Sequence, residues 1–243
     1  MLPFWSVLII SLFAWSAIQA ETVLITGANR GLGLEFARQF KEKGWKVIGT
    51  ARKPAEAKEL NALGIRIEEL DVAKVDSIEK LVQRLEKAPL DVVINNAGVL
   101  IGRHDQLEEE TQEDMQYSFK VNATGPLLVT QALLPNLRRG KRKHIVNISS
   151  QLGSITNNSG GMYAYRASKA ALNQITKSLS IDLKPEGFVC IALHPGWVAT
   201  DMGGENATYS PSQAVASMIQ VITKLNPQVN GQYLDLHGKE LPW

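Results

Sequence analysis

Cysteine is almost absent from this sequence of 243 residues, histidine is rare, and the formal net charge is only +2. A single cysteine, Cys190, excludes an internal disulfide framework, and the apolar residues around it indicate a buried thiol. The four histidines show no metal-ligand spacing with one another or with Cys190, so we expect no metal site. The small net charge, without a basic stripe interleaved with aromatic residues, argues against binding to nucleic acid.

Charged side chains are also absent from residues 1–20, an apolar segment that ends in small residues. Its length suits a secretion signal or a membrane anchor. However, no Lys or Arg precedes the apolar stretch, and no spacer separates it from Thr22, where the first core strand is predicted to begin. An N-terminal extension or a misassigned start codon is the alternative. We expect a cytoplasmic protein, with membrane association through residues 1–20 as the other interpretation.

Linkers, repeats and low-complexity tracts are absent from residues 21–243, which predicts a single domain. Within it, short β-rich runs alternate with helix-length stretches. The predicted strands are 22–26, 45–50, 65–70, 92–95, 144–149, 189–193 and 232–234, and the helical stretches include 32–43, 75–87 and 165–184. This alternation predicts an α/β fold: one doubly wound Rossmann-type domain, with a mostly parallel seven-stranded sheet and helices on both faces.

A glycine-rich turn, Thr26-Gly27-Ala28-Asn29-Arg30-Gly31-Leu32-Gly33, follows the first predicted strand and precedes an amphipathic helix. Glycines permit a tight turn and a close backbone approach, and the free N–H groups of the helix N-terminus can bind a pyrophosphate. The spacing G-x-x-x-G-x-G is a weak signal alone, and its place after the first strand strengthens it. The residues expected to contact a dinucleotide here are Gly27, Asn29, Arg30, Gly31, Leu32 and Gly33.

No carboxylate follows the second predicted strand before Glu56. A site that prefers NAD would place one near the end of this strand, where it binds the ribose hydroxyls. Arg52 occupies this region instead, and together with Arg30 it could hold a 2′-phosphate through charge-assisted hydrogen bonds. The alternative is a pair of solvated arginines. The sequence favours NADP(H).

Tyr165 is the only one of the five tyrosines with a lysine, Lys169, four positions later. On a helix the two side chains share a face, so the lysine charge can lower the tyrosine pKa from its usual value of about 10. Reduction of a carbonyl by a nicotinamide needs such a proton donor, because hydride addition leaves an alkoxide. The alternative is an incidental surface pair.

Two serines end the predicted strand 144–149. A serine hydroxyl at this place can bind a substrate carbonyl oxygen. Because adjacent strand residues face opposite ways, only one of Ser149 and Ser150 can serve, and the other would make a local backbone hydrogen bond.

Four motifs, in order, resemble those of the short-chain dehydrogenase/reductase family. They are residues 26–33, Asn95-Asn96-Ala97-Gly98, Tyr165-Arg166-Ala167-Ser168-Lys169 and Pro195-Gly196-Trp197-Val198-Ala199-Thr200. The resemblance covers almost all of the chain after Thr22. The ending Gly238-Lys239-Glu240-Leu241-Pro242-Trp243, and the short stretch between Thr200 and the next helix, resemble the C-factor-like and sniffer-like carbonyl reductase branch.

The resemblance implies an oxidoreductase that transfers a hydride between NADP(H) and the carbonyl of a small aldehyde or ketone. The alternative is a non-catalytic NADP-binding signalling or regulatory protein on the same fold. The family pattern Ser-x-x-Gly selects Ser150 with Gly153, although the spacing from Ser150 to Tyr165 is longer than is usual. Asn122 matches the asparagine that holds a water near the lysine. Further implied cofactor contacts, besides Tyr165 and Lys169, are Asp71, Val72, Asn95, Ala97, Gly98, Pro195, Gly196, Val198 and Thr200.

Apolar side chains near these motifs predict an apolar substrate pocket, formed by Leu152, Met162, Trp197 and Met202. We therefore expect a small carbonyl compound as the partner. The sequence does not define the oligomeric state and allows a homo-oligomer.

Overall fold

Seven strands form one sheet in the order β3-β2-β1-β4-β5-β6-β7, in a computed structural model that describes residues 20–101 and 106–243. The strands are β1 (Thr22–Ile25), β2 (Lys46–Ala51), β3 (Arg66–Glu69), β4 (Val92–Asn95), β5 (His144–Ile148), β6 (Val189–His194) and β7 (Tyr233–Asp235). The predicted α/β class and seven-stranded sheet are confirmed. Every neighbouring pair is parallel, so the sheet is parallel throughout rather than mostly parallel.

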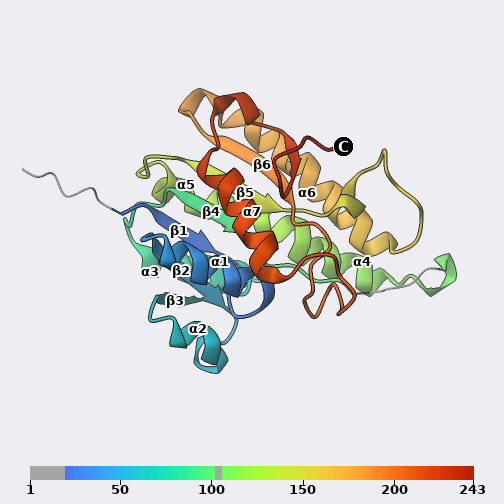
Figure 1. The fold of residues 1–243 in the computed structure, drawn as a ribbon, viewed down its shortest axis with the longest axis horizontal. Helices are drawn as coiled ribbons and strands as arrows, with labels where there is room; N and C mark the ends of the chain where they lie inside the picture. Colours follow the sequence, from blue (N-terminus) through green and yellow to red (C-terminus); the bar gives the residue numbers. More distant parts are fainter. Residues whose placement is uncertain (1–19, 102–105) are drawn as a thin grey trace, which may run out of the picture.

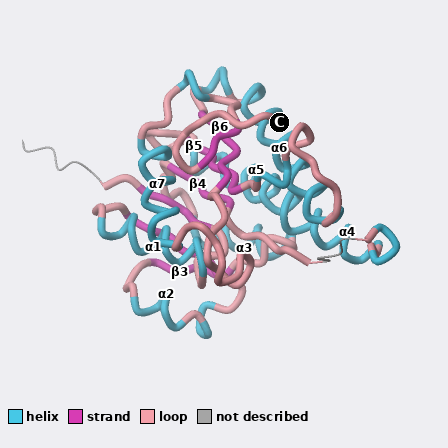
Figure 2. The backbone as a smooth tube through the Cα atoms, turned by 45° about the vertical axis from the view of Figure 1, so that its right-hand side comes forward, coloured by secondary structure: helices cyan, strands magenta, loops and turns pink. Residues whose placement is uncertain are grey.

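Helices cover both faces of this sheet (Figures 1 and 2). They are α1 (Gly31–Glu42), α2 (Lys58–Ala62), α3 (Val75–Leu85), α4 (Gln112–Phe119), α5 (Gly125–Leu137), α6 (Tyr163–Asp182) and α7 (Pro211–Thr223). α1 packs beside α7 on one face, whereas α3 packs beside α5 on the other, where residues at the end of α6 also contribute. None of the described helices is long and apolar enough to cross a membrane.

The alternation of side chains along β1 shows why two layers of helices are needed. Val23 and Ile25 point into the core beneath α1 and α7, while Leu24 between them points into the core beneath α3 and α5. All three are fully buried. A strand with apolar residues on both faces must be covered on both sides, as in parallel sheets generally.

The direction of the strand order reverses between β1 and β4, because β2 and β3 lie on one side of β1 and β4 to β7 on the other. In open α/β sheets, ligands bind beyond the carboxyl ends of the strands at such a switch point. The glycine-rich turn follows β1 and the Asn95–Gly98 motif follows β4, so both predicted motifs meet there. The predictions for residues 1–20 concern a segment that, up to residue 19, lies outside the described residues.

Candidate active site

A cavity of about 250 Å³ opens at this switch point and is walled by the ends of β1, β4, β5 and β6 and by α6. The predicted cofactor residues that line it are Gly27, Asn29, Arg30, Gly31, Leu32, Arg52, Asp71, Val72, Ala97, Gly98, Tyr165, Lys169, Pro195 and Thr200. Four further predicted residues, Gly33, Asn95, Gly196 and Val198, are not part of the wall and contact the surrounding protein. The structure therefore brings most of the predicted set to one cavity.

The glycine turn is shaped by contacts that a side chain would block. A Cβ atom on Gly33 would lie 2.2 Å from the carbonyl oxygen of Gly27, and one on Gly27 would lie 3.0 Å from Cα of Ala97. Gly27 also has a φ of 65°, in the left-handed region that favours glycine. Asn96 Nδ2 donates to the carbonyl oxygens of Thr26 at 2.9 Å and Gly27 at 3.1 Å. These contacts tie the loops after β1 and β4 together and leave the turn open toward the cavity.

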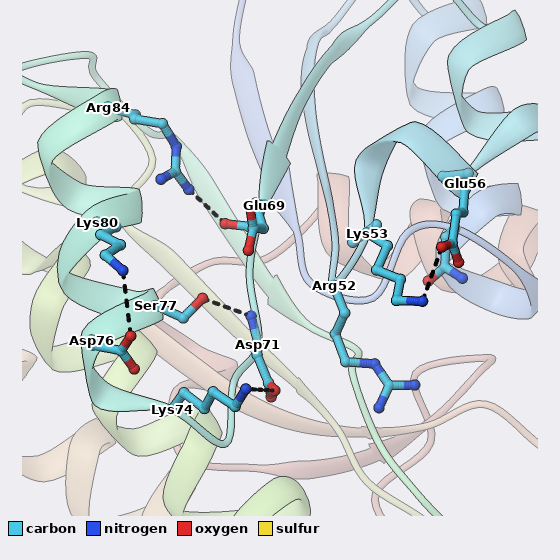
Figure 3. Close-up of a pocket in the computed structure, with 13 residues that line it drawn as sticks. Arg52, Lys53, Glu56, Glu69, Asp71, Lys74, Asp76, Ser77, Lys80 and Arg84 are labelled. Atoms are coloured by element: carbon cyan, nitrogen blue, oxygen red, sulfur yellow. Dashed lines mark hydrogen bonds and ion pairs between the residues drawn. The ribbon is translucent and has the colours of Figure 1, made fainter.

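A second cavity, of about 740 Å³, adjoins the end of β2 and is strongly charged (Figure 3). Lys53 forms an ion pair with Glu56 at 2.9 Å, Lys74 with Asp71 at 3.8 Å, and Lys80 with Asp76 at 3.5 Å. Arg52 lines both cavities and makes no ion pair or hydrogen bond with any described residue. Its guanidinium is therefore available to an anion.

Arg30 differs from Arg52, because it forms an ion pair with Asp201 at 3.0 Å. Both side chains are largely exposed, so water screens the pair. Because only Nη1 of Arg30 contacts Asp201, Arg30 can act with Arg52 on one anion through its other N–H groups or by leaving Asp201. No local motif around Asp201 could have indicated this contact, which joins residues 171 positions apart.

Tyr165 is buried, and the neighbouring Ser150 side chain acts on the pKa of its hydroxyl as a hydrogen-bond partner. The same hydroxyl lies 4.0 Å from Sδ of Met202. Burial raises the pKa of Tyr165, and the hydrogen bond to Ser150 opposes this only in part. We predicted from the sequence that Lys169 lowers the pKa of Tyr165. In the structure this pKa is raised, so the predicted direction is wrong.

The position of Lys169 explains that correction. Its Nζ donates to the carbonyl oxygen of Ile148 at 2.9 Å and lies 5.8 Å from the centroid of the Tyr165 ring. The lysine therefore bonds to a backbone oxygen rather than to the tyrosine hydroxyl. Burial lowers the pKa of Lys169 to about 8. At neutral pH the lysine is still charged, beneath the same cavity.

The two serines at the end of β5 have different partners. The Ser149 hydroxyl is buried and donates to Oδ1 of Asn173 at 2.6 Å, although the residue forms part of the cavity wall. The Ser150 hydroxyl contacts Tyr165 and accepts the N–H of Leu152 at 3.2 Å. The side-chain partners therefore favour Ser150 as the serine that acts with the tyrosine, although Ser149 rather than Ser150 lines the cavity.

Asn122 lies in a π-helical turn, η3 (Lys120–Thr124), between α4 and α5. Its side chain exchanges hydrogen bonds with the backbone of Val99, accepting at 2.8 Å and donating at 2.9 Å, and also donates to Ser168 Oγ at 3.0 Å. A Cβ atom on Gly98 would lie 3.3 Å from Oδ1 of Asn122 and 3.6 Å from Nζ of Lys169. Asn122 and Lys169 thus meet at one glycine, with the Asn122 amide already hydrogen-bonded to protein.

The four predicted substrate residues lie in different surroundings. Met202 lines the cavity, whereas Trp197 is 54% exposed and its Nε1 donates to the carbonyl oxygen of Gly203. Met162 precedes α6 in a left-handed conformation, and Leu152 lies in a 3-10 turn, η4 (Gln151–Gly153). Among these four residues, Met202 accepts a weak hydrogen bond from the Tyr165 hydroxyl.

Metal ligands do not gather in the part of the chain that the structure describes: no group of three or more His, Cys, Asp or Glu residues could hold an ion there. His104 lies outside the described residues. Cys190 is buried as predicted, and burial raises the pKa of its thiol to about 12.

A glycine turn at the switch point of a parallel sheet, next to a serine and a buried Tyr–Lys pair, defines a domain of the dinucleotide-binding oxidoreductase class. Residues 21–210 match the family model described as short chain dehydrogenase, so the chain belongs to the short-chain dehydrogenase/reductase family.

Individual relatives agree with this assignment. The C-signal protein of Myxococcus xanthus is 50% identical over 156 residues, which cover 64% of this chain and 93% of that protein. The carbonyl reductase Sniffer of D. melanogaster superposes with a TM-score of 0.87 at 35% identity, covering 92% of this chain and all of the other. The NADPH-bound carbonyl reductase from chicken fatty liver gives 0.84 at 34% identity, covering 92% and 99%. The predicted resemblance to the C-factor-like and sniffer-like branch is confirmed.

Proposed function

We propose that this protein reduces the carbonyl group of an aldehyde or ketone with NADPH. The observation that carries the proposal is the place of Tyr165, whose buried hydroxyl contacts Ser150 and lines the same cavity as Lys169 and the glycine turn. The names of two similar structures, both called carbonyl reductase and one NADPH-bound, support it. We further propose that residues 21–243 form one NADP-binding catalytic domain.

The residues present fit NADP(H). Gly27 and Gly31 of the glycine turn line the cavity with a positive φ, and a Cβ atom on Gly33 would collide with the carbonyl oxygen of Gly27, as expected of a tight pyrophosphate cradle. Arg52 offers an unpaired guanidinium directly after β2, and the carboxylates that line this cavity are Asp71, which follows β3, and Asp201. This charge favours a 2′-phosphate over the unmodified ribose hydroxyl of NAD(H).

The chemistry follows from the side chains around Tyr165. NADPH, when bound, supplies the hydride that a carbonyl carbon accepts, and negative charge then develops on the carbonyl oxygen. The Ser150 hydroxyl donates a hydrogen bond to that oxygen, and Tyr165 donates its proton to it. Because burial raises the pKa of Tyr165, the hydroxyl holds its proton until the oxygen becomes basic. The charge on Lys169 then stabilises the tyrosinate that remains.

Two further roles are part of the proposal. Asn122, fixed by Val99 and Ser168, supports the return of a proton to Tyr165. Lys169 loses its charge as the pH rises through its pKa of about 8, so we expect reduction to slow above that pH.

The exposed apolar surface of Trp197 and the position of Met202 favour an apolar substrate.

A signalling function that needs the cofactor but no turnover is the second candidate, because the relative at 50% identity is named C-signal. The two candidates differ in one property. A reductase turns over a carbonyl compound, whereas a binding protein holds NADPH without consuming it.

The test follows NADPH absorbance with a panel of aldehydes and ketones, for the unmodified protein, Tyr165→Phe and the control Tyr163→Phe. Loss of the proton donor should lower kcat by on the order of a hundredfold or more, with the NADPH Kd nearly unchanged. Tyr163 is half exposed and lies two residues away, so its variant should retain turnover. Unchanged turnover in Tyr165→Phe would overturn the assignment, and NADPH binding without turnover of any compound would favour signalling.

A further inference from the structure

Ser150 is held by a residue from the other end of the domain. The hydroxyl of Tyr233, on β7, donates to the carbonyl oxygen of Ser150 at 2.6 Å. The same carbonyl accepts the N–H of Gly153 at 2.8 Å, which closes the 3-10 turn η4. Tyr233 is fully buried, and burial raises the pKa of its hydroxyl, which therefore remains a donor. The backbone of Ser150 is thus fixed on one side while its hydroxyl contacts Tyr165 on the other.

The residues after β7 hold Tyr233 in turn. Segment 236–243, called here the return segment, folds back along β7 because Oδ1 of Asp235 accepts the N–H groups of His237 at 2.8 Å and Lys239 at 2.9 Å. The N–H of Leu241 then donates to the carbonyl oxygen of Tyr233 at 2.8 Å. This return places the Trp243 ring 5.4 Å from the Tyr233 ring. Figure 1 shows the chain end beside α6.

The return segment also contacts the loop that follows η4. A main-chain oxygen of Trp243 accepts the N–H and the hydroxyl of Thr156, both at 3.0 Å. Ser154 Oγ donates to the carbonyl oxygen of Pro242 at 2.7 Å. Residues 150–156 are therefore bound at both ends by the last strand and the return segment.

His194 completes the support from β6. Its Nδ1 accepts the N–H of Gln151 at 3.1 Å. Burial lowers the pKa of His194 to about 4, so the ring is neutral and can accept at neutral pH. Neither His194 nor Tyr233 lines the cavity at the switch point, so each acts on the site through the backbone of Ser150 and Gln151.

We infer that Tyr233 is a positioning residue that sets the orientation of the Ser150 hydroxyl toward Tyr165, and that Trp243 and the return segment hold Tyr233 in place. The expected effect of Tyr233 on kcat rests on the proposed reductase function, whereas its expected effect on the mobility of residues 150–156 does not. Tyr233 donates to Ser150, His194 accepts from Gln151, and Ser154 and Thr156 donate to the return segment, so residues 150–156 have little freedom. A hydroxyl that must meet a substrate oxygen needs such a fixed position.

The kinetic test is a double-mutant cycle of Tyr233→Phe and Ser150→Ala at saturating NADPH. Loss of one neutral hydrogen bond should lower kcat about two- to tenfold in Tyr233→Phe, with the NADPH Kd unchanged. If Tyr233 acts through Ser150, the same change in the Ser150→Ala background should lower kcat less than about twofold. The control Ser180→Ala removes another buried hydroxyl that donates to a backbone carbonyl, at 2.7 Å, on the far part of α6. It should leave kcat unchanged. Equal losses of kcat in both backgrounds would overturn the inference.

Amide hydrogen exchange provides a readout that needs no substrate. In Tyr233→Phe the N–H groups of Gln151 and Gly153 should exchange at least several times faster than in the unmodified protein, while those of α7 do not change. Trp243→Ala, which keeps the Tyr233 hydroxyl, should raise exchange in the same segment and serves if Tyr233→Phe folds poorly. Unchanged exchange of residues 150–156 in both variants would refute the positioning role. Absence of carbonyl reduction by the unmodified protein would instead refute the proposed function alone.

Discussion

At the scale of single residues, the two serines after β5 show how burial separates similar side chains. Ser149 Oγ is satisfied inside the protein by Asn173, whereas Ser150 Oγ faces Tyr165. Ser150→Ala should therefore lower kcat by about ten- to a thousandfold, since it removes a donor to the substrate oxygen, with little loss of stability.

The neighbouring variant Ser149→Ala is the matched comparison. It leaves Oδ1 of Asn173 buried without its donor, which should cost about 1–3 kcal/mol of the free energy of unfolding. Urea unfolding and steady-state kinetics on both variants check this. A greater loss of kcat in Ser149→Ala than in Ser150→Ala would reverse the assignment.

Cofactor choice is also decided by single residues. Arg52→Ala should weaken NADPH binding about ten- to a hundredfold and leave NADH binding nearly unchanged, because only NADPH offers a phosphate to the guanidinium. Asp201→Asn should strengthen NADPH binding by up to about fivefold, since it releases Arg30 from an exposed ion pair worth little by itself.

Titration of NADPH and NADH against both variants at low salt measures these effects. Raised ionic strength should reduce the difference between the two cofactors, because mobile ions screen a partly exposed contact. Equal affinity of the unmodified protein for NADPH and NADH would contradict the role given to Arg52.

At the scale of elements, the sequence predicted those features of the fold and site that depend on residues close together in the chain. The parallel sheet followed from the alternation of strands and helices, and Tyr165 and Lys169 share a helix face because they are four residues apart on α6. Contacts between distant segments carry no such signal. The Tyr233 contact to Ser150 joins residues 83 positions apart. The Arg30 contact to Asp201 depends on the path of the loop between β6 and α7. The raised pKa of Tyr165 likewise depends on burial, which a spacing of four residues does not define.

The glycine turn is an element whose shape can be tested by a single methyl group. Gly33→Ala should abolish NADPH binding, because its Cβ would lie 2.2 Å from the carbonyl oxygen of Gly27 and the turn would have to open. Gly44→Ala is a useful comparison, since nothing lies within 4 Å of a Cβ there and only its φ of 81° is unfavourable. That variant should lose about 1 kcal/mol of stability and bind NADPH normally.

Thermal unfolding combined with NADPH titration separates the two outcomes. Normal NADPH affinity in Gly33→Ala would mean that the turn does not cradle the cofactor.

At the scale of the whole molecule, two histidines connect the fold to pH: His144, which is buried, and His194, which is partly buried. His144 begins the central strand β5, and burial lowers its pKa to about 4, helped by the nearby charge of Arg142. Burial lowers the pKa of His194 on β6 to about 4 as well, although Asp235 opposes the shift. In the unfolded chain each would titrate near its ordinary value of about 6.5. Between these values the unfolded state binds more protons than the folded state, so stability falls as the pH falls from about 7 toward 4.

We therefore expect the free energy of unfolding to decrease by roughly 1–2 kcal/mol for each histidine between pH 7 and pH 5. Urea unfolding at the two pH values measures the decrease in the unmodified protein, in His144→Gln and in His194→Asn. Each substitution removes one of the two groups that gain protons on unfolding, so each should reduce the decrease by about half, even if the variant is less stable at pH 7. His237→Gln, which removes an exposed imidazole, should leave the decrease intact. A decrease of the same size in all four proteins would show that other groups cause the acid sensitivity of the fold.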